Sequence, residues 1–244
     1  MAQKLWTRDE EIIVFNLYCK IPFNQSSKNH PEVIRIAKLI NRTPSAVNMK
    51  IGNFGSLDET LRARGITGLA NRSKLDAQIW EEFNNHWDEL AFESERLIAD
   101  LQGERDEFPV AGEESVAARR KVNQDFFQQA VFASYQNVCC ITGLNVSELL
   151  IASRIKSVGD ECERTNPANG LCLNALHGKA FNLGFITVTP DYKIHVATNI
   201  FDVCDNVAVE KFFRAYDGQQ IALPEKFAPP KIFLEYHNDA VFRR

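Results

Sequence analysis

Apolar residues recur at helical spacing in the first 55 positions of the chain and predict three short helices. Thr7 is placed to cap a first helix that runs to about Lys20, where Pro22 stops it. Pro31 begins a second helix, and Thr43 caps a third helix that has a proline at its first position. The pattern therefore predicts a compact three-helix unit.

The third of these helices separates apolar from polar side chains. Its apolar residues are expected on one face, which leaves Ser45, Asn48 and Lys50 on the other. A short helix with a small, amide and basic outer face suits the major groove of DNA, and Arg42, just before it, is a further candidate contact. The alternative is an ordinary three-helix unit whose polar residues are solvated.

Residues 56–75 contain two glycines and predict a turn-rich connection. The basic side chains of this segment are available to the phosphates of a DNA backbone, although a plain solvated loop explains them equally well. These side chains are Arg62, Arg64, Arg72 and Lys74.

Residues 76–101 are acidic and carry apolar residues at helical spacing, including Trp80 and Trp87. Two tryptophans on such a stripe are expected to pack in a core rather than to stack on a ligand. The stretch predicts one long helix, which would serve as a brace between domains or as a dimer face. Residues 102–118 have the polar, Gly and Pro character of a linker and predict the boundary between the two halves.

The second half begins with a predicted helix that opens on three basic residues, Arg119, Arg120 and Lys121. Further on, residues 185–189 and 193–197 predict a β-hairpin. A helical segment at 209–216 follows. His195 and His237 are expected to be ordinary strand and surface residues.

The composition fits a globular chain of two modest domains: 244 residues, of which 45% are hydrophobic and 25% are charged. No apolar run approaches the roughly 18 residues that a membrane span needs, and the start of the chain lacks the apolar region of a signal peptide. We therefore expect a cytoplasmic protein without a membrane partner. The six cysteines include no C-x-x-C pair, which favours buried thiols over a zinc knuckle or a disulfide framework.

The net charge of −4 conceals a strong segregation of charge along the chain. In residues 1–75, Lys and Arg exceed Asp and Glu by six, whereas residues 76–115 carry an excess of eleven acidic residues. The sequence therefore places basic surface in the N-terminal helices and keeps it apart from the acidic stretch.

Four short motifs in the second half form a recognisable set. They are Cys-Cys-Ile-Thr-Gly at 139–143, Ile-Ala-Ser-Arg-Ile at 151–155, Asn-Pro-Ala-Asn-Gly-Leu at 166–171 and Leu-His-Gly-Lys-Ala-Phe-Asn at 176–182. The set resembles the restriction-type branch of the HNH, or ββα-metal, endonuclease family. In that branch the last three motifs read Ala-Ser-His-Ile, Asn-Pro-x-Asn-Gly-Leu and Leu-His-Asp-x-x-Phe-Asp.

The resemblance implies an α+β fold in three parts. Residues 1–55 would form a Myb-like helix-turn-helix unit that binds DNA, residues 56–115 a connecting loop, acidic helix and linker, and residues 116–244 an HNH-like ββα-metal domain. In the family the entry to this domain is basic, so the resemblance adds Arg119, Arg120 and Lys121 to the candidate DNA contacts. Arg154 and Lys156, in and just after the second motif, are candidates too.

Three polar positions depart from the family pattern. Arg154 stands where the family has its general-base histidine, and Gly178 and Asn182 stand where it has aspartates. Arginine cannot accept a proton from water near neutral pH, because its pKa lies above about 12. Of the family's ligands on the motif helix only His177 remains, so the residues left for a divalent cation are few.

Asn169 is retained, and the resemblance implies that it holds the loop that presents the base. His177 is either a weak metal ligand or a helix residue that is hydrogen-bonded within the core. A guanidinium at position 154 fits direct, bidentate binding of a DNA phosphate in place of the lost ion.

Three hypotheses of function stay open. The first is a double-stranded DNA-binding protein without cleavage activity and without a cofactor, which acts as a regulator or a defence accessory. The second is an active endonuclease that uses Mg²⁺ or another divalent cation, with the base supplied by His177 or a metal-bound hydroxide. The third is a protein-interaction module that uses the acidic helix. Duplex DNA is the expected partner, and a palindromic target would imply a homodimer.

Overall fold

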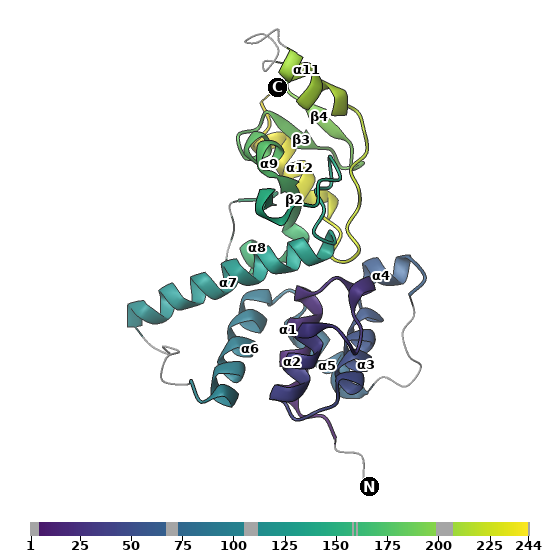
Figure 1. The fold of residues 1–244 in the computed structure, drawn as a ribbon. Helices are drawn as coiled ribbons and strands as arrows, with labels where there is room; N and C mark the ends of the chain where they lie inside the picture. Colours follow the sequence, from purple (N-terminus) through teal and green to yellow (C-terminus); the bar gives the residue numbers. More distant parts are fainter. Residues whose placement is uncertain are drawn as a thin grey trace.

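The computed structural model describes residues 5–66, 73–104, 112–157, 159, 161–198 and 207–243. Figure 1 shows an α+β arrangement in which a helical part and a sheet-bearing part lie on opposite sides of the long helix α7. No helix of the described ranges is long and apolar enough to cross a bilayer.

The first three helices confirm the predicted start sites. Helix α1 (Arg8–Lys20) is capped by Thr7, which forms a reciprocal capping box with Glu10. Helix α2 (Pro31–Leu39) and helix α3 (Pro44–Gly55) each begin with proline, which has no N–H to leave unpaired in a first turn. Thr43 caps α3 by accepting a hydrogen bond from Ala46 N. A short 3-10 turn, η1 (Phe23–Gln25), lies between α1 and α2.

Helix α1 is the central element of the helical part. Every residue from Glu10 to Cys19 is buried, because α1 contacts α3 on one side and α5 (Lys74–Phe83), α6 (Trp87–Gln102) and α7 on the others. The three-helix unit is therefore completed by α5 and α6, which supply core residues such as Ile79 and Leu90.

The connecting region is more regular than the sequence predicts. A short helix, α4 (Glu59–Ala63), lies inside the expected turn-rich segment, with Asp58 as its cap. The predicted single acidic helix is two helices, α5 and α6, because the chain turns at Asn84–His86, where Asn85 has a φ of 76°. Trp87 is only 2% exposed and packs in the core, as predicted.

Helix α7 (Gly112–Ser134) joins the two parts of the fold. It begins before Arg119, so part of the predicted linker is helical. Phe126 and Ala130 belong to the core of the helical part, whereas Phe127 and Val131 belong to the core of the sheet-bearing part. One helix therefore contributes adjacent side chains to both cores.

The sheet-bearing part contains two antiparallel pairs of strands. Strand β1 (Leu150–Arg154) pairs with β2 (Gly170–Asn174), and helix α9 (Ala175–Asn182) follows β2 and packs on both strands. Strands β3 (Ile186–Val188) and β4 (Ile194–Val196) form the predicted hairpin. The remaining short elements are η3 (Ser147–Leu149), α8 (Glu161–Thr165), η4 (Pro167–Asn169), α11 (Val207–Phe212) and η5 (Arg214–Tyr216).

A C-terminal helix, α12 (Lys231–Ala240), packs on β3 and was not predicted. Its His237 is 1% exposed, so the prediction of a surface histidine is wrong. The ring stacks on Phe181 with the centroids 3.8 Å apart, and Nδ1 is 2.8 Å from the Thr187 hydroxyl. Burial lowers the pKa of His237 to about 4, which keeps the ring neutral.

The segment before α12 returns to the helical part and ties the two parts together. The amine of Lys226 is fully buried and donates hydrogen bonds to the carbonyl oxygens of Tyr18 and Ile21 at the end of α1. Phe227 packs edge-on against Tyr18 and Trp87. Burial lowers the pKa of Lys226 to about 8, and the carbonyl oxygens solvate the charged form.

Candidate functional site

Part of the charge segregation seen along the sequence is neutralised in the folded chain. Basic residues of the N-terminal helices pair with acidic residues of α5 and α6, which pack beside them. These pairs are Arg8 with Glu82 and Glu93, Lys20 with Glu95, and Lys50 with Asp76. The expectation of a separate basic surface on the N-terminal helices is therefore wrong for these residues.

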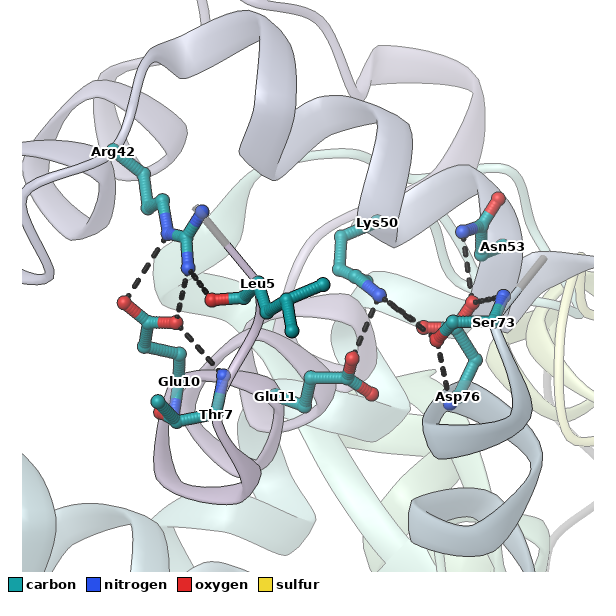
Figure 2. A network of polar contacts seen from close by, with 9 residues as sticks. All are labelled: Leu5, Thr7, Glu10, Glu11, Arg42, Lys50, Asn53, Ser73 and Asp76. Carbon is teal, nitrogen blue, oxygen red and sulfur yellow. Dashed lines mark hydrogen bonds and ion pairs between the residues drawn. The ribbon is translucent and has the colours of Figure 1, made fainter. Parts of the chain in front are cut away.

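Lys50 lies inside the protein and not on the outer face of α3. Its residue exposure is 4%, and its amine contacts the carboxylates of Glu11 (2.7 Å) and Asp76, which are both fully buried (Figure 2). Lys50 follows Val47 by three residues, a spacing that places both on the same helical face. The prediction that Lys50 contacts DNA is contradicted by this burial.

Arg42 is also held within the helical part. Its guanidinium binds the carboxylate of Glu10 at 2.7 Å (Figure 2). It also lies 4.5 Å from the centroid of the Trp6 ring. Of the other residues predicted to line a recognition face, Ser45 is exposed, and Asn48 accepts a hydrogen bond from Ser26. Neither predicted cation is therefore presented to solvent by α3 or by the turn before it.

The basic residues of the connecting segment, residues 56–75, differ in their surroundings. Arg62 and Lys74 are exposed, whereas Arg64 donates a 3.3 Å hydrogen bond to the carbonyl oxygen of Glu225. Arg72 lies outside the described residues.

Arg154 is the last residue of β1, and two neighbours fix its guanidinium. Its Nε donates a 2.8 Å hydrogen bond to the carbonyl oxygen of Arg164, and its Cζ lies 4.3 Å above the ring of Phe127. Burial, and then the nearby charge of Arg164, lower the pKa of Arg154. The two Nη atoms have no hydrogen-bond partner among the described residues, so this edge of the guanidinium is available to a ligand.

A hollow of about 290 Å³ opens beside this guanidinium. It is lined by Ser153, Arg154, Arg164, Asn182 and His237 among others, and none of the described residues that line it is acidic. The hydroxyl of Ser153 is buried and has no hydrogen-bond partner. The hollow therefore combines two guanidiniums with an unsatisfied hydroxyl, which are groups that bind an anion.

Asn169 and Gly170 shape the chain around Arg154. The Asn169 side chain is fully buried, accepts a 2.8 Å hydrogen bond from Lys156 N and donates to the carbonyl oxygens of Lys156 and Glu163. It therefore holds the loop after β1 against α8. Gly170 pairs with Arg154 across the sheet, and an added Cβ there would lie 2.3 Å from Val131. Only glycine lets β2 approach α7 this closely.

The candidate phosphate contacts outside the hollow differ in whether another side chain of the protein already contacts them. Lys156 is paired with Glu163 at 2.8 Å, and the guanidinium of Arg119 lies over the ring of Phe92. Arg120 and Lys121 are exposed on α7.

His177 is buried in the core and hydrogen-bonded through both ring nitrogens. Asn174 donates to its Nδ1 at 2.9 Å, and its Nε2 donates to the carbonyl oxygen of Phe212 at 2.7 Å. Since a carbonyl oxygen only accepts, Nε2 carries a proton, and Nδ1 accepts the hydrogen bond from the Asn174 amide. Neither nitrogen has a lone pair free for a metal ion or a water molecule.

The other two altered positions also fit a metal poorly. Gly178 packs against β1, where an added Cβ would lie 2.1 Å from Ile151 Cδ1. Asn182 presents an exposed, uncharged amide. No group of three or more His, Cys, Asp or Glu side chains that could hold a metal ion occurs within the described ranges. The residues present do not fit the divalent cation of the resembling family.

Four of the cysteines confirm the prediction of buried thiols, and a fifth, Cys162, is half-buried. Cys139 lies next to His177. Burial raises the pKa of Cys139, but hydrogen bonds with His177 and Thr142 outweigh this effect and bring it to about 7. Cys204 lies outside the described residues.

Sequence reasoning missed Arg164 and Ser153, the two residues that complete the hollow beside Arg154. Arg164 lies on α8, and no feature of its neighbouring sequence marks it. Comparison with known proteins adds no assignment, since no protein-family model matches the chain. No curated protein matches it significantly either.

Proposed function

We propose that this chain binds the phosphate backbone of double-stranded DNA at the hollow beside Arg154 and does not cleave it. The observation that carries the proposal is the pairing of Arg154 and Arg164 around a hollow whose described lining has no carboxylate. Two guanidiniums this close repel one another, and an anion between them would relieve that repulsion.

The fixed orientation of Arg154 favours phosphate over a loosely held counter-ion. Stacking on Phe127 and the bond to the Arg164 carbonyl leave the two Nη atoms as one free edge. A guanidinium edge matches two oxygens of a phosphate, and a side chain that is already ordered loses little entropy on binding. The Ser153 hydroxyl supplies one more donor.

Two observations on the groups around the hollow support the proposal that DNA is not cleaved. Arg154 has no lone pair to accept a proton from water, and both nitrogens of His177 are engaged in the core. No observation therefore favours the endonuclease hypothesis. Without a cleavage step, the protein would act on DNA by occupying it, as a regulator or a defence accessory does.

The proposal is tested by gel shift and by incubation with supercoiled plasmid in magnesium, manganese and nickel. We expect a salt-dependent shift of duplex DNA that Arg154→Ala weakens at least tenfold, and an uncut plasmid. Arg35→Ala is the matched control, because it removes one exposed positive charge on α2 that does not line this hollow. Equal binding by the two variants, or nicking by the unmodified protein, would overturn the proposal.

A further inference from the structure

A second hollow of about 330 Å³ lies beside Arg154, and α7 and α8 line it. Arg154 and Arg164 belong to both hollows, and the second adds Arg120 and Asn123 from α7. The two guanidiniums thus stand between two adjacent spaces, each large enough for a small polar group.

Asn123 is the unusual residue of the second hollow. It is 2% exposed, and neither its Oδ1 nor its Nδ2 has a hydrogen-bond partner. A buried amide in this state destabilises the fold, since its donors and acceptor have lost water without replacement. A ligand that supplies the missing bonds would recover that loss.

We infer that the second hollow is a second phosphate subsite, so that two phosphates of one DNA strand flank Arg154. Asn123 Nδ2 would donate to an oxygen of the second phosphate, while Oδ1 would accept an N–H from a neighbouring guanidinium. Arg120 is exposed and supplies a further positive charge at this hollow. The inference rests on the proposed function and extends it from one phosphate to two.

Glu161 alone is acidic among the described residues that line this hollow, so its removal tests the charge of the ligand group that binds there. Its carboxylate lies 4.0 Å from Arg164 Nη1 and offsets part of that charge. If the ligand group is a phosphate, removing this carboxylate strengthens binding. If the group is instead a hydroxyl or a base edge that donates to Glu161, removing the carboxylate weakens binding.

The experiment measures how the affinity for duplex DNA depends on salt, with Asn123→Leu, Arg120→Ala and Glu161→Gln as variants and Arg35→Ala as control. Leucine replaces the amide by an apolar group of similar shape, so the variant is expected to fold. Each phosphate that a lysine or arginine no longer neutralises lowers the magnitude of the slope of log K against log salt by about 0.9. We expect a slope reduced by about this amount for Arg120→Ala, weaker binding with the parent slope for Asn123→Leu, and tighter binding by Glu161→Gln.

A second probe separates the inference from the proposed function. A thymidine dinucleotide with a 5′-phosphate carries two phosphates at the spacing of one DNA strand, and we expect it to compete with DNA at least tenfold better than thymidine 5′-monophosphate, which carries one. If Arg154→Ala weakens binding while Asn123→Leu and Arg120→Ala match the control, the second subsite does not exist and the first stands. If Arg154→Ala also matches the control, the proposed function fails. Weaker binding by Glu161→Gln would overturn the phosphate assignment of the second hollow.

Discussion

The substitution Lys50→Met tests whether Lys50 is an internal counter-ion or a DNA contact. The unbranched apolar side chain of methionine can follow the path of the lysine stem while removing the charge. Glu11 and Asp76, whose side chains are fully buried, would then share a site without a cation. The DNA-contact interpretation instead predicts an intact fold and weaker binding.

The magnitude follows from the burial of the three groups. Removing one partner of a buried ion pair costs about 3–5 kcal/mol, because it leaves an uncompensated charge in the interior. A domain of this size loses about 2–4 °C of thermal midpoint per kcal/mol. Lys50→Met should therefore lower the midpoint by about 6–20 °C, the upper end corresponding to both carboxylates staying ionised.

The assay is thermal unfolding followed by circular dichroism at pH 7.5, with Lys74→Met as the control. Lys74 is exposed in the first turn of α5, so its loss should leave the midpoint within about 2 °C of the parent. A midpoint for Lys50→Met as high as that of Lys74→Met would refute the buried network. If Lys50→Met instead lost DNA affinity without losing stability, α3 would have to be interpreted as a basic recognition helix.

Three further predictions concern stability. Burial raises the pKa of Glu11 from 4.5 to about 7, so the stability that its protonation provides is complete below pH 4.5 and is lost as the pH rises to 7. The difference in unfolding free energy between the parent and Glu11→Gln should therefore change by about 3 kcal/mol between these pH values and stay constant at higher pH. Denaturant titrations at a series of pH values measure this difference. Asn123→Leu should raise the thermal midpoint by about 2–4 °C, since it removes an unsatisfied buried amide, and a lowered midpoint would show that the amide is bonded in solution. Gly178→Ala should lower the free energy of unfolding by about 1–3 kcal/mol, because the added methyl group overpacks against Ile151. In a double-mutant cycle, Ile151→Ala should recover part of that loss. Additive effects of the two substitutions would show that α9 and β1 are not in contact there.

Local chemistry explains which elements could be predicted from the sequence. The starts of α1 and α3 follow from Thr7 and Thr43, because a capping hydroxyl and the residues after it act within one turn. The hairpin of β3 and β4 follows from alternation around a short turn. Helix α12 escaped prediction because its pattern is short and its burial depends on β3, which lies far away in the sequence.

Of the candidate site, the sequence predicted Arg154 but not the residues that surround it. Arg154 stands out within its motif, and the structure places it at the edge of a hollow. Arg164 and Asn123 reach the same place from α8 and α7, a convergence that only the tertiary packing creates. The prediction of a basic surface near the start of the chain failed for the same reason, because tertiary packing brings acidic residues of α5 and α6 against these basic residues.

Arg154 is proposed to hold a DNA phosphate without cutting the strand. The most direct measurement is the affinity of the parent, Arg154→Ala and Arg35→Ala for one DNA duplex across a series of salt concentrations. We predict that Arg154→Ala binds at least tenfold more weakly than the parent, with a slope of log K against log salt reduced by about 0.9 for each phosphate lost, while Arg35→Ala keeps the parent slope. Identical slopes and affinities for Arg154→Ala and the parent would contradict the account.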